Sequence, residues 1–133
     1  MAKVRHTLIF VFIIGFISNW AWENLHSPLY FHPNGEDITQ LMLLSAALMD
    51  AVIITAVAAV FLSSAYLRSR LWLAFVIGIA IAVAIERFSL VAQRWAYSEL
   101  MPVIPMLETG LVPTVQLGLL TWLILKCAVR RCG

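Results

Sequence analysis

The sequence has few charged residues. They make up 12% of its 133 residues, whereas apolar residues make up 62%. A soluble domain usually carries roughly 25% charged residues, and a short chain can hide only a limited share of its apolar surface from water. The composition therefore excludes an ordinary water-soluble domain and predicts that the protein contacts a lipid bilayer. The net charge of +2 and the lack of a basic patch with interleaved aromatics argue against a nucleic-acid partner.

Cysteine is also scarce. Cys127 and Cys132 lie in the last seven residues, beside Lys126 and two arginines. No second pair of Cys or His residues accompanies them, so a zinc site is not expected. We expect both thiols on the cytoplasmic side, where thiols stay reduced. Palmitoylation near the membrane is the alternative to two unmodified thiols.

Sequence motifs of the common enzyme classes are missing. There is no Gly-rich phosphate loop, no Ser-His-Asp signature and no HExxH motif. The acidic and His residues have no recognised metal-ligand spacing, so no metal site is expected, and no cofactor is indicated.

Long apolar runs are what the sequence does contain. A helix needs about 20 mostly apolar residues to cross ~30 Å of hydrocarbon. The four runs that meet this need cover residues 7–25, 38–66, 71–91 and 111–129. We therefore predict one all-α domain, a bundle of four antiparallel transmembrane helices in which short connections join neighbours.

The first run follows Lys3 and Arg5 and could be mistaken for a secretion signal. The small-residue cleavage pattern of such signals is missing, and Asn19-Trp20-Ala21-Trp22-Glu23 follows instead. We therefore expect this segment to be kept as the first span.

Positive charges are divided unevenly between the two sides that these spans imply. One side would hold Lys3, Arg5, Arg68, Arg70, Lys126, Arg130 and Arg131, and the other would hold Arg87 and Arg94. Because Lys and Arg favour the cytoplasmic side, both termini are predicted to be cytoplasmic. The outer boundary would carry an aromatic belt of Trp20, Trp22, Tyr30, Trp95 and Tyr97.

Asp50 is the clearest candidate for function. It lies twelve residues into the second predicted span, or ~18 Å along a helix, which places it near the bilayer midplane. Charged groups there cost roughly 2.5–3.5 kcal/mol on insertion scales and are functional candidates by default. Its neighbours in the span are apolar, so a partner must come from another span or from water. The alternative is a neutral Asp that only joins helices.

Other polar residues occur in the remaining three spans. Asn19, Glu23 and His26 follow the i, i+4, i+7 spacing of one helix face, and Glu23 with His26 is a plausible acid–base pair. The alternative is a helix end wetted by water. Glu86 lies near the outer end of the third span, where an ion pair with Arg87 or Arg94 is the alternative to a functional role.

Arg94 offers a planar fork suited to a phosphate or carboxylate. Gln116, in the fourth span, has the alternative role of bonding across helices. The segment Gln93–Pro105, which includes Trp95 and Tyr97, is apolar for an outer loop. It is either a lid over a pocket or an interfacial anchor.

These polar residues share one depth. Asn19, Glu23, His26, Glu86 and Gln116 all fall in the outer half, and Asp50 reaches the middle. Structural polar residues placed at random would be spread over both leaflets. The pattern therefore predicts a wet pocket that opens to the outer face.

Two segments, Trp22-Glu23-Asn24-Leu25-His26-Ser27-Pro28-Leu29-Tyr30 and Arg94-Trp95-Ala96-Tyr97-Ser98-Glu99-Leu100-Met101-Pro102, carry a family resemblance. With Asp50 and Gly110–Leu117, the chain resembles a group of small four-span bacterial membrane proteins whose activity is uncharacterised. The resemblance implies four spans, a bacterial inner membrane and importance for these segments, but no reaction. It also implies a Gly before the acidic residue of the second span. Met49 stands there instead, which predicts a more crowded Asp50.

Three classes of function remain open. The leading hypothesis is a pocket that binds or acts on a lipid-like or small amphipathic molecule, with acid–base work by Glu23, His26, Asp50 and Glu86. Asn19, Arg94, Trp95, Tyr97 and Gln116 would contact the ligand. The second is a proton-coupled transporter or permeation unit, possibly a homo-oligomer, in which Asp50 cycles its proton. The third is an accessory subunit that packs through small residues such as Ala46, Ala47, Ala51, Ala58 and Ala59.

Overall fold

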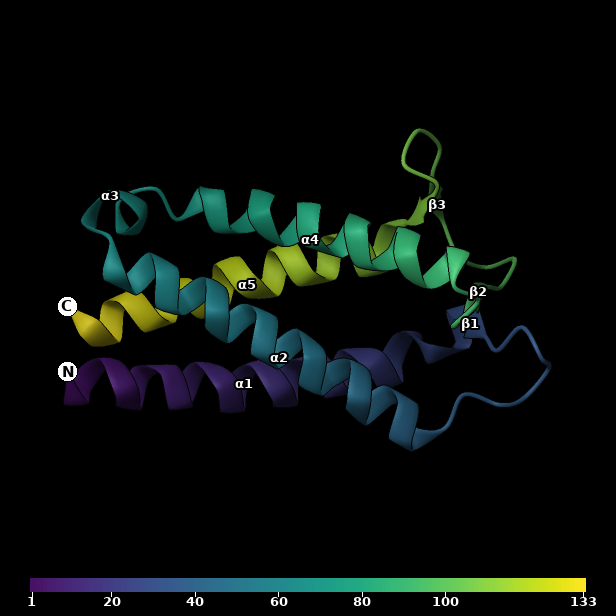
Figure 1. Cartoon of the computed structure of the whole chain (residues 1–133), viewed down its shortest axis with the longest axis horizontal. Helices are drawn as coiled ribbons and strands as arrows, with labels where there is room; N and C mark the ends of the chain where they lie inside the picture. Colours follow the sequence, from purple (N-terminus) through teal and green to yellow (C-terminus); the bar gives the residue numbers. More distant parts are fainter.

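The structure is a computed structural model that describes residues 1–133, and most of the chain is helical. Four helices are long and apolar enough to cross a membrane, as the sequence predicts. They are α1 (Ala2–His26), α2 (Gln40–Ser63), α4 (Trp72–Val91) and α5 (Leu111–Cys132). Two short helices occur in the connections, η1 (Ser27–Leu29) and α3 (Ala65–Arg68); α3 is labelled in Figure 1.

Local sequence explains where the helices end. Helix α1 continues to His26, and η1 follows because Pro28 disfavours α-helix in the residue before it. The hydroxyl of Thr39 accepts the N–H of Met42 at 3.3 Å and caps the start of α2. The predicted second span was too long: α2 ends at Ser63, and the extended Ser64 then starts α3.

Small residues set which helices lie close together. Helix α1 packs along α2 and α5, and α4 packs along α5, whereas α2 and α4 barely contact each other. Gly15 of α1 lies against Ala51 of α2, and Gly78 of α4 lies against Gly118 of α5. Both termini and α3 lie at one end of the molecule, and the strands lie at the opposite end, called here the loop end (Figure 1).

Two short strand pairs, which the sequence analysis did not predict, organise the loop end. Strand β1 (Tyr30–Phe31) pairs antiparallel with β2 (Ala96–Tyr97), so that the segment after α1 is joined to the segment after α4. Strand β3 (Val103–Ile104) pairs antiparallel with β4 (Thr109–Gly110), which leads directly into α5.

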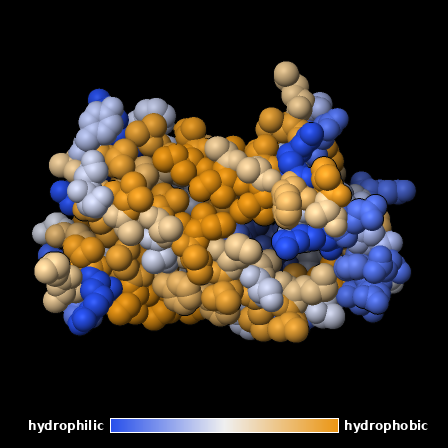
Figure 2. Space-filling view, viewed as in Figure 1, coloured by the Kyte–Doolittle hydropathy of each residue, from blue (hydrophilic) through white to orange (hydrophobic).

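The core nearer the termini is apolar, with side chains from all four long helices, among them Val11, Ile54, Phe61, Ala74 and Leu125. Ala47, Ala51 and Ala58 are also buried within the chain. The expectation that these three alanines form an exposed surface for a partner was therefore wrong. The surface along the helices is mostly apolar, as a lipid-facing surface requires (Figure 2).

Candidate functional site

A cavity of about 640 Å³ lies towards the loop end, among the four long helices. Ligand pockets in proteins typically measure roughly 300–1,000 Å³. Its polar or charged lining residues are Glu23, Ser27, Tyr30, His32, Ser45, Asp50, Glu86, Arg94 and Gln116, and its other lining residues are largely apolar. The face of the molecule between α2 and α4 is hollowed, with hydrophilic residues inside the hollow (Figure 2). The cavity thus opens sideways, where these two helices barely touch.

Most of the site residues predicted from sequence meet at this cavity. Those that line it are Glu23, Asp50, Glu86, Arg94, Trp95 and Gln116. Asn19, His26 and Tyr97 do not line it, but each contacts a residue that does. The structure therefore places these three as supports of the lining rather than as ligand contacts.

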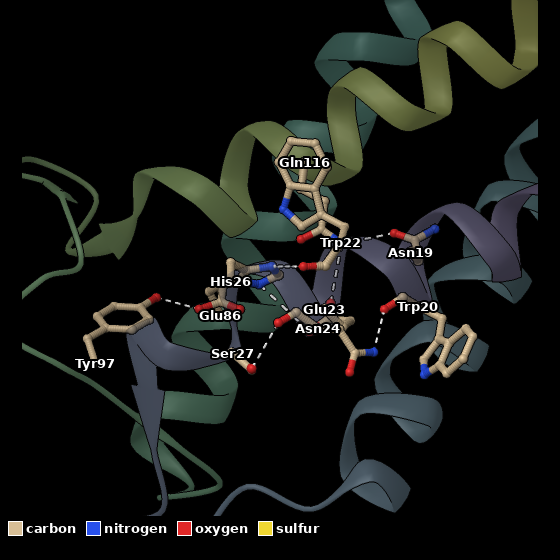
Figure 3. A network of polar contacts seen from close by, with 10 residues as sticks. All are labelled: Asn19, Trp20, Trp22, Glu23, Asn24, His26, Ser27, Glu86, Tyr97 and Gln116. Carbon is tan, nitrogen blue, oxygen red and sulfur yellow. Dashed lines mark hydrogen bonds and ion pairs between the residues drawn. The ribbon is translucent and has the colours of Figure 1, made fainter.

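Asn19 and Gln116 fix the position of Glu23. The amide of the fully buried Asn19 donates to the carbonyl of Gly15 at 2.7 Å, which leaves its oxygen free to accept. Gln116 Nε2 donates to the Asn19 side-chain oxygen at 3.0 Å and to Glu23 Oε1 at 3.3 Å (Figure 3). One glutamine thus holds α5 to α1, and it also presents a neutral donor to the carboxyl group at the cavity wall.

His26 orients Glu23 from behind. Its Nδ1 lies 2.6 Å from the carbonyl oxygen of Trp22, so Nδ1 carries the donated hydrogen. Its Nε2 lies 3.7 Å from Glu23 Oε2 (Figure 3). The two residues are close, as the spacing predicts. Because His26 is buried and does not line the cavity, it can exchange a proton with a ligand only through Glu23.

Glu86 is held by Tyr97 from the loop end. The Tyr97 hydroxyl donates to the Glu86 carboxyl group (Figure 3). The same hydroxyl accepts the Gly110 N–H at 2.8 Å. Burial is the main cause that raises the pKa of Tyr97 above its usual range, and the hydrogen bond to Glu86 raises it further. The alternative of an ion pair between Glu86 and Arg87 or Arg94 was wrong, because Arg87 pairs with Glu108 at 2.6 Å and Arg94 forms no ion pair.

Tyr30 is a lining residue for which the sequence analysis predicted only a place in the aromatic belt. Its ring centroid lies 5.4 Å from that of His26, 6.0 Å from that of Trp95 and 5.5 Å from that of Tyr97. Burial is the main cause that raises the pKa of Tyr30, and the negative charge of the nearby Glu86 adds to it. The β1–β2 pairing brings these rings together, so the segment around Trp95 forms part of the cavity wall as well as an aromatic cluster.

The end of α4 aims Arg94 and Trp95 at the cavity. Gln93 adopts a left-handed conformation, with φ 54°. The N–H of Arg94 donates to the Ser89 carbonyl at 2.9 Å, and that of Gln93 to the Leu90 carbonyl at 3.2 Å. This pair of bonds is a Schellman motif, which ends a helix and fixes the direction of the next residues.

Asp50 has no hydrogen-bond partner and no ion pair, although it lines the cavity. It lies ten residues, or ~15 Å of helix, after the first residue of α2. Of the lining carboxyl groups Glu23, Asp50 and Glu86, it is therefore the one farthest from the loop end. Met49, which is 53% exposed, lines the same cavity next to Asp50. No group of three or more His, Cys, Asp or Glu side chains is arranged to hold a metal ion.

Comparison of the chain with models of protein families, with curated proteins and with solved structures found no match. The function proposed below therefore rests on the cavity and on the residues that line it.

Proposed function

We propose that this protein binds a lipid-like or small amphipathic molecule in the cavity between α2 and α4, in the outer half of a bacterial inner membrane. Its termini lie on the cytoplasmic side in this proposal. The positive charges support that orientation, because α3 with Arg68 lies at the same end as both termini (Figure 1).

The observation that carries the proposal is the shape and chemistry of the cavity. It is lined by carboxyl groups, an arginine and apolar side chains, and it opens sideways between two helices that would face lipid. An amphipathic molecule fits this arrangement, because its apolar part can stay in the bilayer while its polar part lies among Glu23, Asp50 and Glu86. Displacing water from such a mixed pocket favours a ligand with both kinds of surface.

Acid–base chemistry on the bound molecule is the natural extension of this proposal. Asp50 has no protein partner, and Glu23 is backed by His26, so both carboxyl groups are available to exchange a proton with a ligand. Asn19 and Tyr97 would act as positioning residues in such a reaction, since each hydrogen-bonds within the layer behind the cavity wall.

The proton-coupled transporter is supported less well. Transport requires access to the carboxyl groups from the opposite side, yet the core nearer the termini is packed with Val11, Ile54, Phe61 and Leu125. The accessory-subunit hypothesis loses part of its basis, because Ala47, Ala51 and Ala58 are buried within this chain.

Blocking the cavity tests the proposal. Ala46 lines the cavity, whereas Ala56 lies on the same helix, is exposed and does not line it. Ala46→Phe is expected to release molecules that co-purify in mild detergent, as seen by native mass spectrometry, and Ala56→Phe is expected to retain them. Equal retention by both variants, or the absence of any bound amphiphile in the wild type after incubation with lipid, would contradict the proposal.

A further inference from the structure

The charged groups that line the cavity are not paired with one another. Arg94 forms no ion pair with any carboxylate, and its guanidinium lies over the Phe88 ring, 5.6 Å from the centroid. Arg87, the residue directly after Glu86, is already paired with Glu108 at 2.6 Å. Arg94 is therefore the lining arginine with its planar donor fork free, and such forks bind phosphate well.

No lysine or arginine forms a hydrogen bond or ion pair with the three carboxyl groups of the cavity. Glu23 accepts from the neutral amide of Gln116, and Glu86 accepts from the Tyr97 hydroxyl. Asp50 has no hydrogen bond or ion pair although it is the deepest of the three. An unpartnered, mostly buried carboxyl group that faces a cavity indicates a missing donor, because buried polar groups normally have partners.

Positive and negative groups also lie at different depths. Arg94 follows the end of α4, at the loop end of the cavity. Glu86 lies about one and a half turns inside the end of α4, and Asp50 lies ~15 Å along α2. A ligand that fills both positions needs an anionic group near the loop end and a cationic group further in. A purely anionic headgroup would meet the carboxyl groups, and a purely cationic one would leave Arg94 without a partner.

We propose that the cavity selects a zwitterionic amphiphile, with its phosphate bound by Arg94 and its ammonium group bound among Glu23, Asp50 and Glu86. This inference rests on the proposed function and names the chemistry of its ligand. The shared chemistry is an aminoalkyl phosphate. A membrane lipid is its source rather than a soluble phosphate, because the cavity is lined largely by apolar side chains and opens between α2 and α4.

The test compares two phospholipids with identical acyl chains, phosphatidylethanolamine and phosphatidylglycerol, on the purified full-length protein. Both carry a phosphate, but only the first carries an amine. Native mass spectrometry over a lipid titration should show that the wild type prefers phosphatidylethanolamine by about tenfold or more, the effect of one charge-assisted hydrogen bond. Asp50→Asn should remove most of this preference, whereas the control Asp37→Asn, on an exposed loop, should keep it.

Arg94→Gln isolates the phosphate contact. This variant should weaken the binding of both lipids by a similar factor of about ten, because both carry the phosphate. Arg87→Gln is the matched control, since Arg87 lies on the same helix end and does not line the cavity. Equal weakening by the two arginine variants would overturn the assignment of Arg94, because it would reflect only a lost surface charge.

The remaining outcomes separate the inference from the proposed function. Equal affinity of the wild type for both lipids would overturn the zwitterionic ligand, while release of both lipids by Ala46→Phe would preserve the cavity as a binding site. Retention of both lipids by Ala46→Phe would overturn the assignment of the cavity as the binding site. Displacement of bound phosphatidylethanolamine by an equal concentration of soluble phosphoethanolamine would overturn the lipid source.

Discussion

The contact between α4 and α5 gives a prediction whose size can be worked out from the structure. A Cβ atom added at Gly78 would lie 2.6 Å from the Gly118 Cα and 2.9 Å from the Leu117 carbonyl oxygen. Carbon atoms pack at about 3.5–4.0 Å. Because both neighbours are backbone atoms, they cannot swing aside, and Gly78→Ala must push the two helices apart by about 1 Å at this point.

The energetic cost follows from that displacement. Overpacking of this kind costs typically 1–3 kcal/mol, and a gap of ~1 Å also forfeits a quarter to a half of the attraction between facing atoms. Alanine regains about 1 kcal/mol relative to glycine through helix propensity. We therefore expect a net loss of about 1–2 kcal/mol in the free energy of unfolding. Ala82 and Leu117 lie within about one turn of the contact and line the cavity, so ligand binding should weaken as well.

Gly15→Ala provides the matched control. A Cβ at Gly15 would lie 3.6 Å from the Ala51 Cα, which is an ordinary contact, so this variant should be neutral or up to about 1 kcal/mol more stable than the wild type. Both variants can be unfolded in mixed micelles with increasing denaturing detergent and followed by circular dichroism. Stability of Gly78→Ala equal to that of the wild type, or a larger loss in Gly15→Ala, would refute the reasoning.

Two further predictions concern the loop end. Gln93→Gly should stabilise the protein by about 1 kcal/mol in thermal unfolding, because Gln93 has φ 54° and glycine adopts this conformation without steric cost, whereas Gln93→Ala should not. Tyr97→Phe should cost about 1–3 kcal/mol, because it leaves the Gly110 N–H without its acceptor and Glu86 without its donor. Since the pKa of Tyr97 is raised in the folded state, wild-type stability should fall as the pH rises above about 10, and Tyr97→Phe should show a shallower fall in a series of alkaline unfolding curves.

The helices and the general location of the cavity could be predicted from sequence because both follow from local patterns. An apolar run of about 20 residues predicts a span without knowledge of its neighbours. The stripe of Asn19, Glu23 and His26 depends only on helical spacing, and the structure buries two of its members, Asn19 and His26. The shared depth of the polar residues then followed from counting along each span.

The features that the sequence did not reveal all depend on contacts between distant residues. The β1–β2 pair joins two-residue strands, which are too short to show an alternating pattern. The turn at Gln93 lacks the glycine or asparagine that usually marks the end of a helix. Arg87 pairs with Glu108, which lies beyond the whole of β2 and β3 in the chain, so spacing within the helix suggested the wrong partner.

The position of the cavity follows from how the helices come together. Where two long helices approach most closely, a small residue lies on each side, Gly15 with Ala51 and Gly78 with Gly118. Helices α2 and α4 barely contact each other, and α2 presents Leu41, Met42 and Met49 to the cavity between them. Bringing these helices together would remove water from Asp50 and Glu86 without giving Asp50 a partner, and burying an unpaired carboxyl group is costly. The same polar residues that make the cavity useful for binding therefore also keep it from closing, and a ligand that supplies a cation there would be expected to draw α2 and α4 together.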